Sequence, residues 1–472
     1  MKKISFFGLV LAFMTMAIFI VSCSQPLYPH GSTYPPRGNG DEGSDIPGWE
    51  DGGSGGGRKT VVQQLDWLRE NAPAGTVWYV WAWMRNPYET INVRQNIHGV
   101  GDSGITVYLR TCSGYTGPGN RRRLKRGSNI TMLYVYSGSR LILENIVLQG
   151  RTHPTPPDPP PHVTFPLVFV NAGTLEKRNG SEIYKDSPNA SNAVRLVNRA
   201  ALIMSGNALI DVTYDYPLTR RGQDGVELVN GSSLTMSDTA NIINGRRGVY
   251  LVNSTLTMIG SAHISGHRWE GVIGRNISTI SMYNSTAIRA NNNADDVANS
   301  VYAGVNLLSS NLTMRNSAQI HSNANGGGVF AALSLVRMFD NASIHYNIHR
   351  NTGSSVTWGS GGVSLNASRL YMYSHGVQIR GNSTESSRGG GVRVCPNSVL
   401  SIHGGLIYGN EIGVITTNRN VNASVLPPPA GHALFVDTGG TVRHGTTTVP
   451  LSPNYSDITF GVNSTGGRVG GW

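Results

Sequence analysis

The sequence predicts an all-β fold: a single-stranded right-handed parallel β-helix with three short strands in each coil of about 22 residues and a short N-terminal capping helix. Two observations predict it. A Gly-Val pair recurs through the second half of the chain, and two further apolar patterns follow each pair at nearly fixed offsets. The composition agrees, because 59 of the 472 residues are glycine and only 14% are charged, which is typical of a turn-rich β protein.

The Gly-Val pair opens the first strand of each repeat. The steps between successive glycines are 23, 23, 33, 24, 34, 29 and 22 residues, so the short steps define one coil and the longer ones contain inserted loops. The pairs are Gly225-Val226, Gly248-Val249, Gly271-Val272, Gly304-Val305, Gly328-Val329, Gly362-Val363, Gly391-Val392 and Gly413-Val414.

Two more strands follow within each coil. The second places two apolar residues around one mostly polar residue, which is the period of a strand with one buried face. Its copies are Leu234-Thr235-Met236, Leu256-Thr257-Met258, Ile280-Ser281-Met282, Leu312-Thr313-Met314, Val336-Arg337-Met338, Leu370-Tyr371-Met372 and Leu400-Ser401-Ile402. The third centres on an isoleucine, at Ile242, Ile264, Ile288, Ile320, Ile344, Ile379 and Ile407.

Strands this short cannot form a sheet within one coil, but they can pair in parallel with the strands of the next coil, about 4.8 Å away. The stacked coils then enclose a column of inward-facing apolar side chains. An asparagine often follows the isoleucine, where it tolerates a left-handed corner and can pair with its copies in neighbouring coils. These residues are Asn244, Asn291, Asn323, Asn347, Asn382 and Asn410. A leucine-rich repeat is the alternative solenoid, but its helical segments are missing.

A helix is expected to cover the open end of the first coil, as a stacked solenoid requires. Val61, Leu65 and Leu68 share one helical face, and Thr60 can serve as the N-cap. The helix is expected to end near Asn71, ahead of a proline.

The first residues have the pattern of a secretion signal. An uncharged apolar run follows Lys2 and Lys3 and ends in Ile20-Val21-Ser22-Cys23. This ending resembles the lipobox of bacterial lipoproteins, which implies that Cys23 is lipid-modified and becomes the new N-terminus. A plain secretion signal with an incidental cysteine is the alternative. Ser24, in place of the aspartate that retains lipoproteins at the inner membrane, favours the outer membrane, on its periplasmic or its cell-surface side.

Four parts follow from these features. A lipoprotein signal peptide spans 1–22, and a Gly/Pro/Ser-rich tether spans 23–59. The tether has few apolar residues to bury, so we expect it to be disordered. The β-helix with its capping helix spans 60–445, and a C-terminal tail spans 446–472.

Taken together, the lipobox, the opening helix Leu65-Asp66-Trp67-Leu68-Arg69-Glu70-Asn71-Ala72 and the repeats resemble a known group. The chain is similar to the right-handed parallel β-helix lipoproteins of host-associated Gram-negative-type bacteria, within the broad pectate-lyase-like fold. The resemblance covers the chain from about Thr60 to Gly445. It implies the fold and the membrane anchor, but no particular reaction.

The charge balance predicts attraction to polyanions. The formal net charge is +11, and loss of Lys2 and Lys3 with the signal leaves 11 − 2 = +9. With Cys23 modified, Cys112 and Cys395 remain, and we expect two isolated, buried thiols. No Cys-X-X-Cys pair or His/Cys cluster has metal-ligand spacing, so neither a metal nor a cofactor is expected.

One constellation of charged residues is a candidate catalytic site. Asp224, Arg247 and Glu270 each precede the glycine of three successive coils and should stack, with His267 and Trp269 nearby. The favoured interpretation is a surface ladder that neutralises itself. The alternative is an acid–base pair close to the inverting-glycosidase limit of about 9.5 Å.

The densest basic run is the candidate binding site. Arg121, Arg122, Arg123, Lys125 and Arg126 are expected in a Gly-rich loop, either simply solvated or as a polyanion-binding patch whose binding weakens with salt. No nucleic-acid-binding motif accompanies the run, so no specific nucleic-acid partner is expected.

The leading hypothesis is a non-enzymatic, membrane-anchored surface lipoprotein whose β-helix binds acidic glycans, host matrix or envelope polyanions in an adhesin-like way. A carbohydrate-active β-helix enzyme, either a polysaccharide lyase or a glycoside hydrolase, is the alternative. Scarce carboxylates in the repeats argue against it. A purely structural spacer is the third hypothesis, and the oligomeric state stays open.

Overall fold

The computed structural model describes residues 59–82, 88–111, 121–128, 130–150, 165–184, 192–213, 224–291, 303–350, 359–384, 389–408, 434–437 and 439–444, with the short strands at 421–422, 458–460 and 469–470. The signal, the tether, Cys23, Cys112, Asn410 and the Gly413-Val414 pair lie outside this part.

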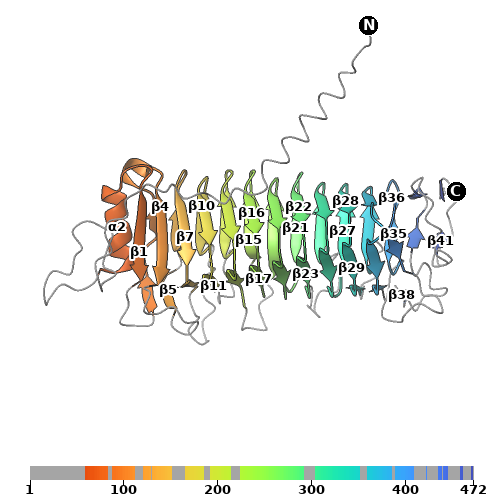
Figure 1. Cartoon of the computed structure of the whole chain (residues 1–472), viewed down its shortest axis with the longest axis horizontal. Helices are drawn as coiled ribbons and strands as arrows, with labels where there is room; N and C mark the ends of the chain where they lie inside the picture. The colour runs from red at the N-terminus through yellow and green to blue at the C-terminus, as the bar shows by residue number, and fades with distance from the viewer. Residues whose placement is uncertain are drawn as a thin grey trace, which may run out of the picture. The chain divides into compact units, whose positions relative to one another are not determined.

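The chain folds into a right-handed parallel β-helix, as the repeats predict. Three long sheets run the length of the body, and every strand in them pairs in parallel with the strand one coil away. Figure 1 shows the strands side by side along the long axis. Up to β37 (Leu406–Ile407) the strands of these sheets follow one another along the chain in the order sheet C, sheet A, sheet B, one strand to each sheet in a coil, and the described strands beyond it in these three sheets belong to sheets C and A.

The bounds of the strands follow the predicted repeat. Sheet A contains β1 (Val77–Ala82), β4 (Thr106–Thr111), β7 (Arg140–Glu144), β10 (Thr174–Lys177), β13 (Ala201–Met204), β16 (Ser233–Met236), β19 (Thr255–Met258), β22 (Thr279–Met282), β25 (Asn311–Met314), β28 (Leu335–Met338), β32 (Arg369–Met372), β36 (Val399–Ile402), β40 (Thr441–His444) and β42 (Val469–Gly470). Sheet B contains β2 (Tyr88–Ile91), β5 (Arg122–Arg126), β8 (Ile146–Gln149), β11 (Glu182–Tyr184), β14 (Leu209–Asp211), β17 (Asn241–Ile243), β20 (His263–Ser265), β23 (Ala287–Arg289), β26 (Gln319–His321), β29 (Ser343–His345), β33 (Gln378–Arg380) and β37 (Leu406–Ile407). Sheet C contains β3 (Gln95–Ile97), β6 (Leu133–Val135), β9 (Val168–Asn171), β12 (Val194–Val197), β15 (Asp224–Val229), β18 (Arg247–Val252), β21 (Val272–Arg275), β24 (Val305–Leu308), β27 (Val329–Ala332), β31 (Val363–Asn366), β35 (Val392–Val394), β39 (Leu434–Val436) and β41 (Ile458–Phe460).

Smaller elements complete the body. A three-stranded sheet is formed by β30 (Ile348–His349), β34 (Ser383–Thr384) and β38 (Val421–Asn422), and a 3-10 turn, η2, spans Val100–Asp102. Beyond residue 445, β41 pairs with β39 and β42 pairs with β40, so paired strands continue into the C-terminal tail.

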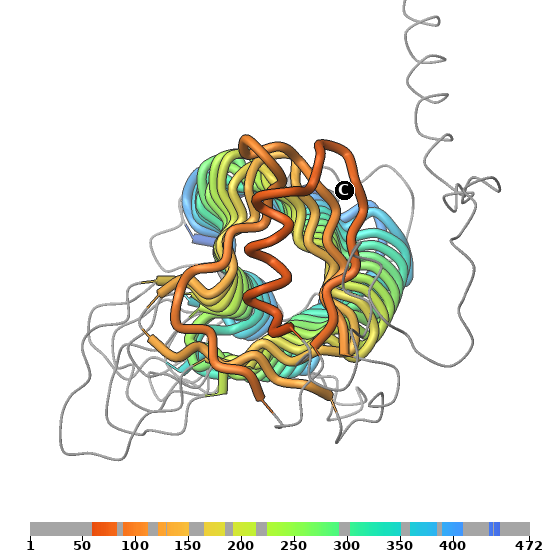
Figure 2. The backbone as a smooth tube through the Cα atoms, turned by 90° about the vertical axis from the view of Figure 1, so that its left-hand side faces the viewer, coloured from red at the N-terminus to blue at the C-terminus, as the bar shows by residue number. Residues whose placement is uncertain are grey.

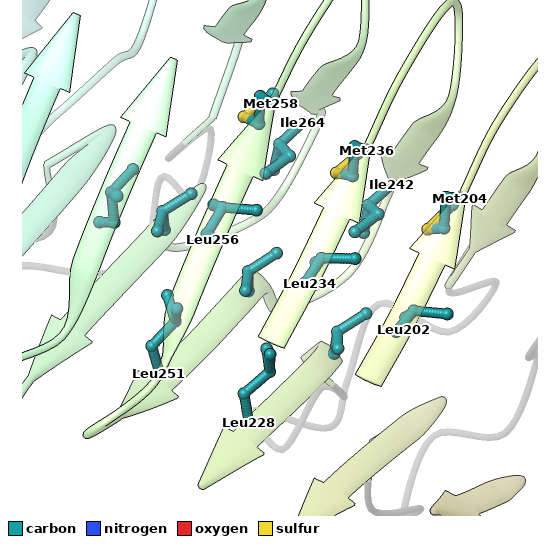
Figure 3. Packing of buried hydrophobic residues seen from close by; sticks show 14 of the residues in the cluster. Leu202, Met204, Leu228, Leu234, Met236, Ile242, Leu251, Leu256, Met258 and Ile264 are labelled. Atoms are coloured by element: carbon teal, nitrogen blue, oxygen red, sulfur yellow. The ribbon is translucent and has the colours of Figure 1, made fainter. Parts of the chain in front are cut away.

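The interior is built from columns of identical or similar side chains. The register sets Leu202 beside Leu234, and Met204 beside Met236, and the same pairing continues to the next coil. Figure 3 shows these leucines and methionines, with Ile242 and Ile264, pointing into the same core. All of them have no exposed surface. Each coil thus buries its apolar face only against its neighbours.

The repeat glycine is required by the close approach of successive coils. A Cβ atom at Gly248 would lie 2.4 Å from the carbonyl oxygen of Gly271, and one at Gly362 would lie 2.2 Å from that of Gly391. Any larger residue would force the coils apart and break the backbone hydrogen bonds between them. The Gly-Val pair therefore recurs for a steric reason.

The predicted capping helix is present as α2 (Val61–Asn71) and closes the N-terminal end of the coil stack (Figure 2). Thr60 accepts a hydrogen bond from the Gln63 backbone, as in a capping box. The carboxylate of Glu89, from the first coil, also accepts hydrogen bonds from the backbone of Val61 and Val62, at 3.1 and 3.3 Å. An acidic group at a helix N-terminus satisfies donors that the helix leaves open.

An asparagine ladder runs along the corner between sheets B and C. The side-chain oxygen of each ladder asparagine accepts a hydrogen bond from the backbone of the ladder residue in the preceding coil, at 3.1 Å in each step. The ladder residues are His267, Asn291, Asn323, Asn347 and Asn382, all fully buried. His267 thus takes the position of an asparagine at the N-terminal end.

The structure corrects the expected geometry of this corner. The left-handed conformation belongs to the residue just before each ladder position, for example Ala290 with φ 51° and Ser322 with φ 56°. Asn244, grouped with the ladder in the sequence, has φ 65° and is itself the left-handed residue. It therefore tolerates the corner but does not stack in the ladder.

A serine ladder lies along the corner between sheets C and A, and the sequence reasoning missed it. Ser334 donates its hydroxyl to the carbonyl of Ala332 at 2.6 Å and accepts a hydrogen bond from the Ser310 backbone at 3.1 Å. The same position is serine in seven coils: Ser232, Ser254, Ser278, Ser310, Ser334, Ser368 and Ser398. In the sequence, a serine stands two residues before the first apolar residue of the Leu-Thr-Met pattern in these coils.

Candidate functional site

The basic run that begins at Arg121 forms a strand, so the expectation of a loop was wrong. Residues Arg122 to Arg126 are β5, paired with β2 on one edge and β8 on the other. The register sets Arg122 beside the core residue Ile146, and the alternation of the strand turns Arg122, Leu124 and Arg126 to the same face. Pairing along both edges fixes the backbone as a strand, whatever the charge of the side chains.

The run consequently does not present one continuous basic patch. Arg122 and Arg126 are buried, Arg121 and Lys125 are half-buried, and only Arg123 of the five basic residues is exposed. Arg121 lies 3.3 Å from a carboxylate oxygen of Glu182. The Nζ atom of Lys125 lies 3.7 Å from the centre of the Tyr88 ring. Binding of polyanions by this run stays a prediction, but its surface is much smaller than the sequence suggested.

Asp224, from the candidate catalytic column, is engaged by two arginines. Its carboxylate oxygens accept hydrogen bonds from Arg247 at 2.8 and 2.9 Å and from Arg246 at 3.1 and 3.3 Å. Only 3% of Asp224 is exposed. Charge-assisted pairs of this bidentate kind are strong, and here both oxygens are occupied. Sequence reasoning named Arg247 but missed Arg246, its neighbour in the chain.

Glu270 lies one coil beyond Arg247, so the structure places the three predicted residues on successive coils. The Gly248 amide donates to the backbone carbonyl of Glu270 at 3.1 Å. The carboxyl group is buried, with 2% of the residue exposed, and its Oε2 atom has no hydrogen-bond partner in the described part of the chain. Burial raises the pKa of Glu270 to about 7.

The neighbouring His267 and Trp269 have structural contacts. His267 accepts a hydrogen bond from the Gly245 amide at 2.9 Å on Nδ1 and donates from Nε2 to the Ile242 carbonyl at 3.1 Å. Burial lowers its pKa to about 4, so the imidazole is neutral at physiological pH. The Trp269 ring lies under the Arg246 guanidinium, 4.8 Å away. Both residues therefore support the coil corner.

The buried Glu270 predicts a pH-dependent stability. A carboxyl whose pKa is raised on folding stabilises the protein below the unfolded pKa of 4.5 and loses that contribution as the pH rises through about 7. Glu270→Gln mimics the protonated form, so it should raise the free energy of unfolding by about 3 kcal/mol at pH 8 and change it little at pH 4. Urea unfolding of both proteins at the two pH values measures this. Equal stabilities at pH 8 would contradict it.

Carboxylates become scarce toward the C-terminal coils. Among the described residues, the ion pairs of carboxylates with arginine lie mostly before Glu270, and Asp437–Arg393 is the exception. The earlier pairs are Asp66–Arg69, Glu144–Arg110, Glu176–Arg140, Glu176–Arg178, Glu182–Arg121, Glu227–Arg195 and Asp224 with its two arginines. Between Gly271 and Thr384 the sequence has seven arginines and three aspartates. Cations outnumber carboxylates in both parts of the body, since Lys59 to Glu270 has 22 lysines and arginines and 15 carboxylates, but carboxylates are scarcest in the C-terminal coils.

A column of basic and imidazole side chains lies on sheet B in these C-terminal coils, and sequence reasoning missed it. The column is Arg289, His321, His345 and Arg380, which the register sets side by side on four successive strands. They are the last residues of their strands, one position after the central isoleucine, so they point outward. We call this set the basic column. In the sequence, each member of the basic column directly follows the central isoleucine of its sheet B strand, and this position was not compared between repeats.

The two imidazoles of the basic column are stacked. Their ring centres are 4.9 Å apart and the planes differ by 7°. Burial and the nearby Arg289 lower the pKa of His321 to about 4; burial, His321 and Arg380 lower that of His345 to about 3. Both rings are neutral at pH 7, so the charge of the column is carried by its two terminal arginines.

Lys177 is a second unexpected feature. It occupies the interior position that is Leu143 in the preceding coil and Met204 in the next one. No part of Lys177 is exposed, and its Nζ atom has no hydrogen-bond partner among the described residues. Burial lowers the pKa of this amine to about 7. It lies inside the body, out of reach of any ligand.

Of the two expected thiols, Cys395 lies in the described part and is buried and unbridged, while Cys112 lies outside it. Burial raises the pKa of the Cys395 thiol to about 12, so it is unreactive. Within the described ranges no group of three His, Cys, Asp or Glu side chains is placed to hold a metal ion.

The fold defines the chain as a right-handed parallel β-helix protein. Compared with known protein families, curated proteins and solved structures, the chain matches none of them. None of the helices in the described residues is long and apolar enough to cross a membrane.

Proposed function

We propose that this protein is a membrane-anchored, non-enzymatic surface lipoprotein whose β-helix binds acidic glycans. The anchor is the diacylglyceryl group at Cys23, in the outer membrane, and the Gly/Pro/Ser-rich tether holds the body away from the lipid. The partner class is an acidic polysaccharide of the host matrix or of the envelope, and no sequence-specific nucleic acid is involved.

The observation that supports this proposal is the scarcity of carboxylates in the C-terminal coils, on a body that is basic throughout. Among the described residues up to Glu270, six of the twelve carboxylates form ion pairs with arginine. Between Gly271 and Thr384 the sequence has seven arginines and only three aspartates. A rigid surface with unbalanced charge of one sign attracts ligands of the other sign. Because the strands are stacked at about 4.8 Å, such a surface repeats along the body and suits an extended polymer.

A carbohydrate-active enzyme is the second candidate, and Glu270 is the observation that favours it. A carboxyl group with a pKa raised to about 7, next to a tryptophan and an ionised cluster, has the properties of a general acid. Its burial and the two arginines on Asp224 weigh against it, because neither carboxyl group is open to a substrate.

A glycan-array screen of the protein from Ser24 onward, at 50 mM and 500 mM salt and with product analysis of every hit, tests both candidates. We expect binding to sulfated and carboxylated glycans that falls at least about tenfold between the two salt concentrations, without cleavage. Cleavage products lost in Glu270→Gln would favour the enzyme. No binding to any acidic glycan would contradict the proposed function.

A further inference from the structure

We infer that the basic column on sheet B is the site that binds the acidic polysaccharide, an inference that rests on the proposed function. The column consists of Arg289, His321, His345 and Arg380 on the four successive strands β23, β26, β29 and β33. Its chemistry suits sulfate or carboxylate groups of an extended sugar chain lying along the axis of the body.

The column has no carboxylate in line with it. The last acidic residue at this position of sheet B is Asp211, and Ile243 and Ser265 separate it from Arg289. Three coil steps therefore lie between Asp211 and Arg289, on the order of 14 Å. At that distance an exposed carboxylate is largely screened at physiological salt.

The two arginines are placed to contact separate anionic groups. Arg289 is exposed and has no ion pair within the described part of the chain. Arg380 is half-buried, and its guanidinium donates to the Tyr346 hydroxyl at 2.9 Å, which fixes its orientation. The guanidinium groups are three coil steps apart, about 14 Å, a span that needs an extended ligand with more than one charge. A small single anion would contact only one of them.

The stacked imidazoles form the floor between the arginines. His321 is half-buried and His345 is buried, so the contact surface is mainly the edge of His321. The Nδ1 atom of His345 contacts the Ser343 hydroxyl at 3.2 Å, and that of His321 contacts the Ser322 hydroxyl at 3.0 Å. These contacts hold both rings in place through Nδ1, so Nε2 of His321 is the ring nitrogen left to hydrogen-bond a sugar or its anionic substituent.

No comparable set exists among the described strands of sheet A in the same coils, although that sheet also carries arginines. Arg337 lies between Thr313 and Tyr371 in its column, and Arg369 lies between Leu335 and Val399. Each of these arginines is flanked by uncharged residues, so the charge on sheet A is scattered. The pair Arg337 and Arg369 is therefore a matched control for Arg289 and Arg380.

The test compares two double variants of the mature protein from Ser24 onward, Arg289→Ala/Arg380→Ala and Arg337→Ala/Arg369→Ala. Both remove two positive charges from outward positions of the same coils. Affinity is measured for heparin, which carries sulfates and carboxylates, and for hyaluronan, which carries carboxylates only. We expect the sheet B variant to lose at least about tenfold in affinity for whichever polymer the wild type binds, and the sheet A variant less than about threefold.

Each outcome is decisive. Equal losses in the two variants would overturn the inference, since binding would then follow net charge and not this column. Binding by the wild type that the sheet B variant retains would overturn it as well, while the proposed function would stand. If the wild type binds neither polymer nor any other acidic glycan, the proposed function itself fails. Should the sheet B variant fold poorly by circular dichroism, the single variant Arg289→Ala replaces it, with Arg369→Ala as its control.

Discussion

Replacing Lys177 by methionine is expected to raise the free energy of unfolding by about 4–5 kcal/mol at pH 7 and below. Folding moves this amine from water into the apolar interior and lowers its pKa from 10.5 to about 7. Between these two values the unfolded chain binds more protons than the folded one, so the stability of the wild type rises with pH. Methionine removes this dependence and fits the column, since Met204 already occupies the same position one coil on.

Urea unfolding at pH 6, 8 and 10 measures the effect. The advantage of Lys177→Met should be largest at pH 6 and should shrink to under about 1 kcal/mol at pH 10, where the folded amine is neutral and the unfolded amine is close to its pKa of 10.5. The reciprocal change Met204→Lys is the matched control: it should destabilise the protein, most at pH 6 and least at pH 10. A Lys177→Met protein that is less stable than the wild type at pH 6 would show that the amine has a stabilising partner.

Loss of an inner member of the asparagine ladder should have the second-largest effect. The Asn347 side chain accepts from the backbone and the side chain of Asn323, at 3.1 and 2.9 Å, and donates to Asn382 and to the Ile320 carbonyl, at 2.9 and 3.0 Å. Asn347→Ala leaves buried donors of Asn323 without acceptors. Each such group costs about 1–3 kcal/mol, so we expect a destabilisation of about 3 kcal/mol or more.

The matched control for this change is Asn311→Ala. Asn311 lies on the outer face of sheet A, and its side chain has no hydrogen bond to the described residues, so its removal should change stability by less than about 0.5 kcal/mol. Hydrogen exchange of the Asn323 amide adds a local measure, and its protection should fall in Asn347→Ala. Equal effects of the two substitutions would show that the ladder does not stabilise the corner.

The repeat pattern alone was sufficient to predict much of the fold. The Gly-Val pairs, the Leu-Thr-Met strands and the isoleucines gave the three sheets, and α2 begins and ends where its N-cap and apolar spacing predict. These features recur in successive coils from Gly225 onward because each of these coils meets similar neighbours. Repetition therefore makes the pattern visible without any knowledge of the long-range contacts.

Details of the two corners needed the structure. Asn244 and Asn291 follow their isoleucines at similar distances, yet one is the left-handed residue and the other is buried in the ladder. A shift of one position along the chain decides whether an asparagine is the left-handed residue or the buried ladder residue. The conformational preference of asparagine cannot distinguish the two, because it suits both positions. The serine ladder was overlooked for a related reason, since serine is as common in exposed turns as in buried ones.

The candidate sites depended still more on tertiary structure. We could derive four features from the sequence alone: the pattern of an export signal, the coil period, the stacking of Asp224, Arg247 and Glu270, and the basic net charge of the chain. Which charges are neutralised is set by the tertiary structure. A charged side chain forms an ion pair or is buried according to whether it points outward or inward from its strand and which residue lies beside it in the neighbouring coil. For that reason the dense run at Arg121 proved largely buried or paired, while the basic column, whose members are tens of residues apart, emerged only when the coils were stacked.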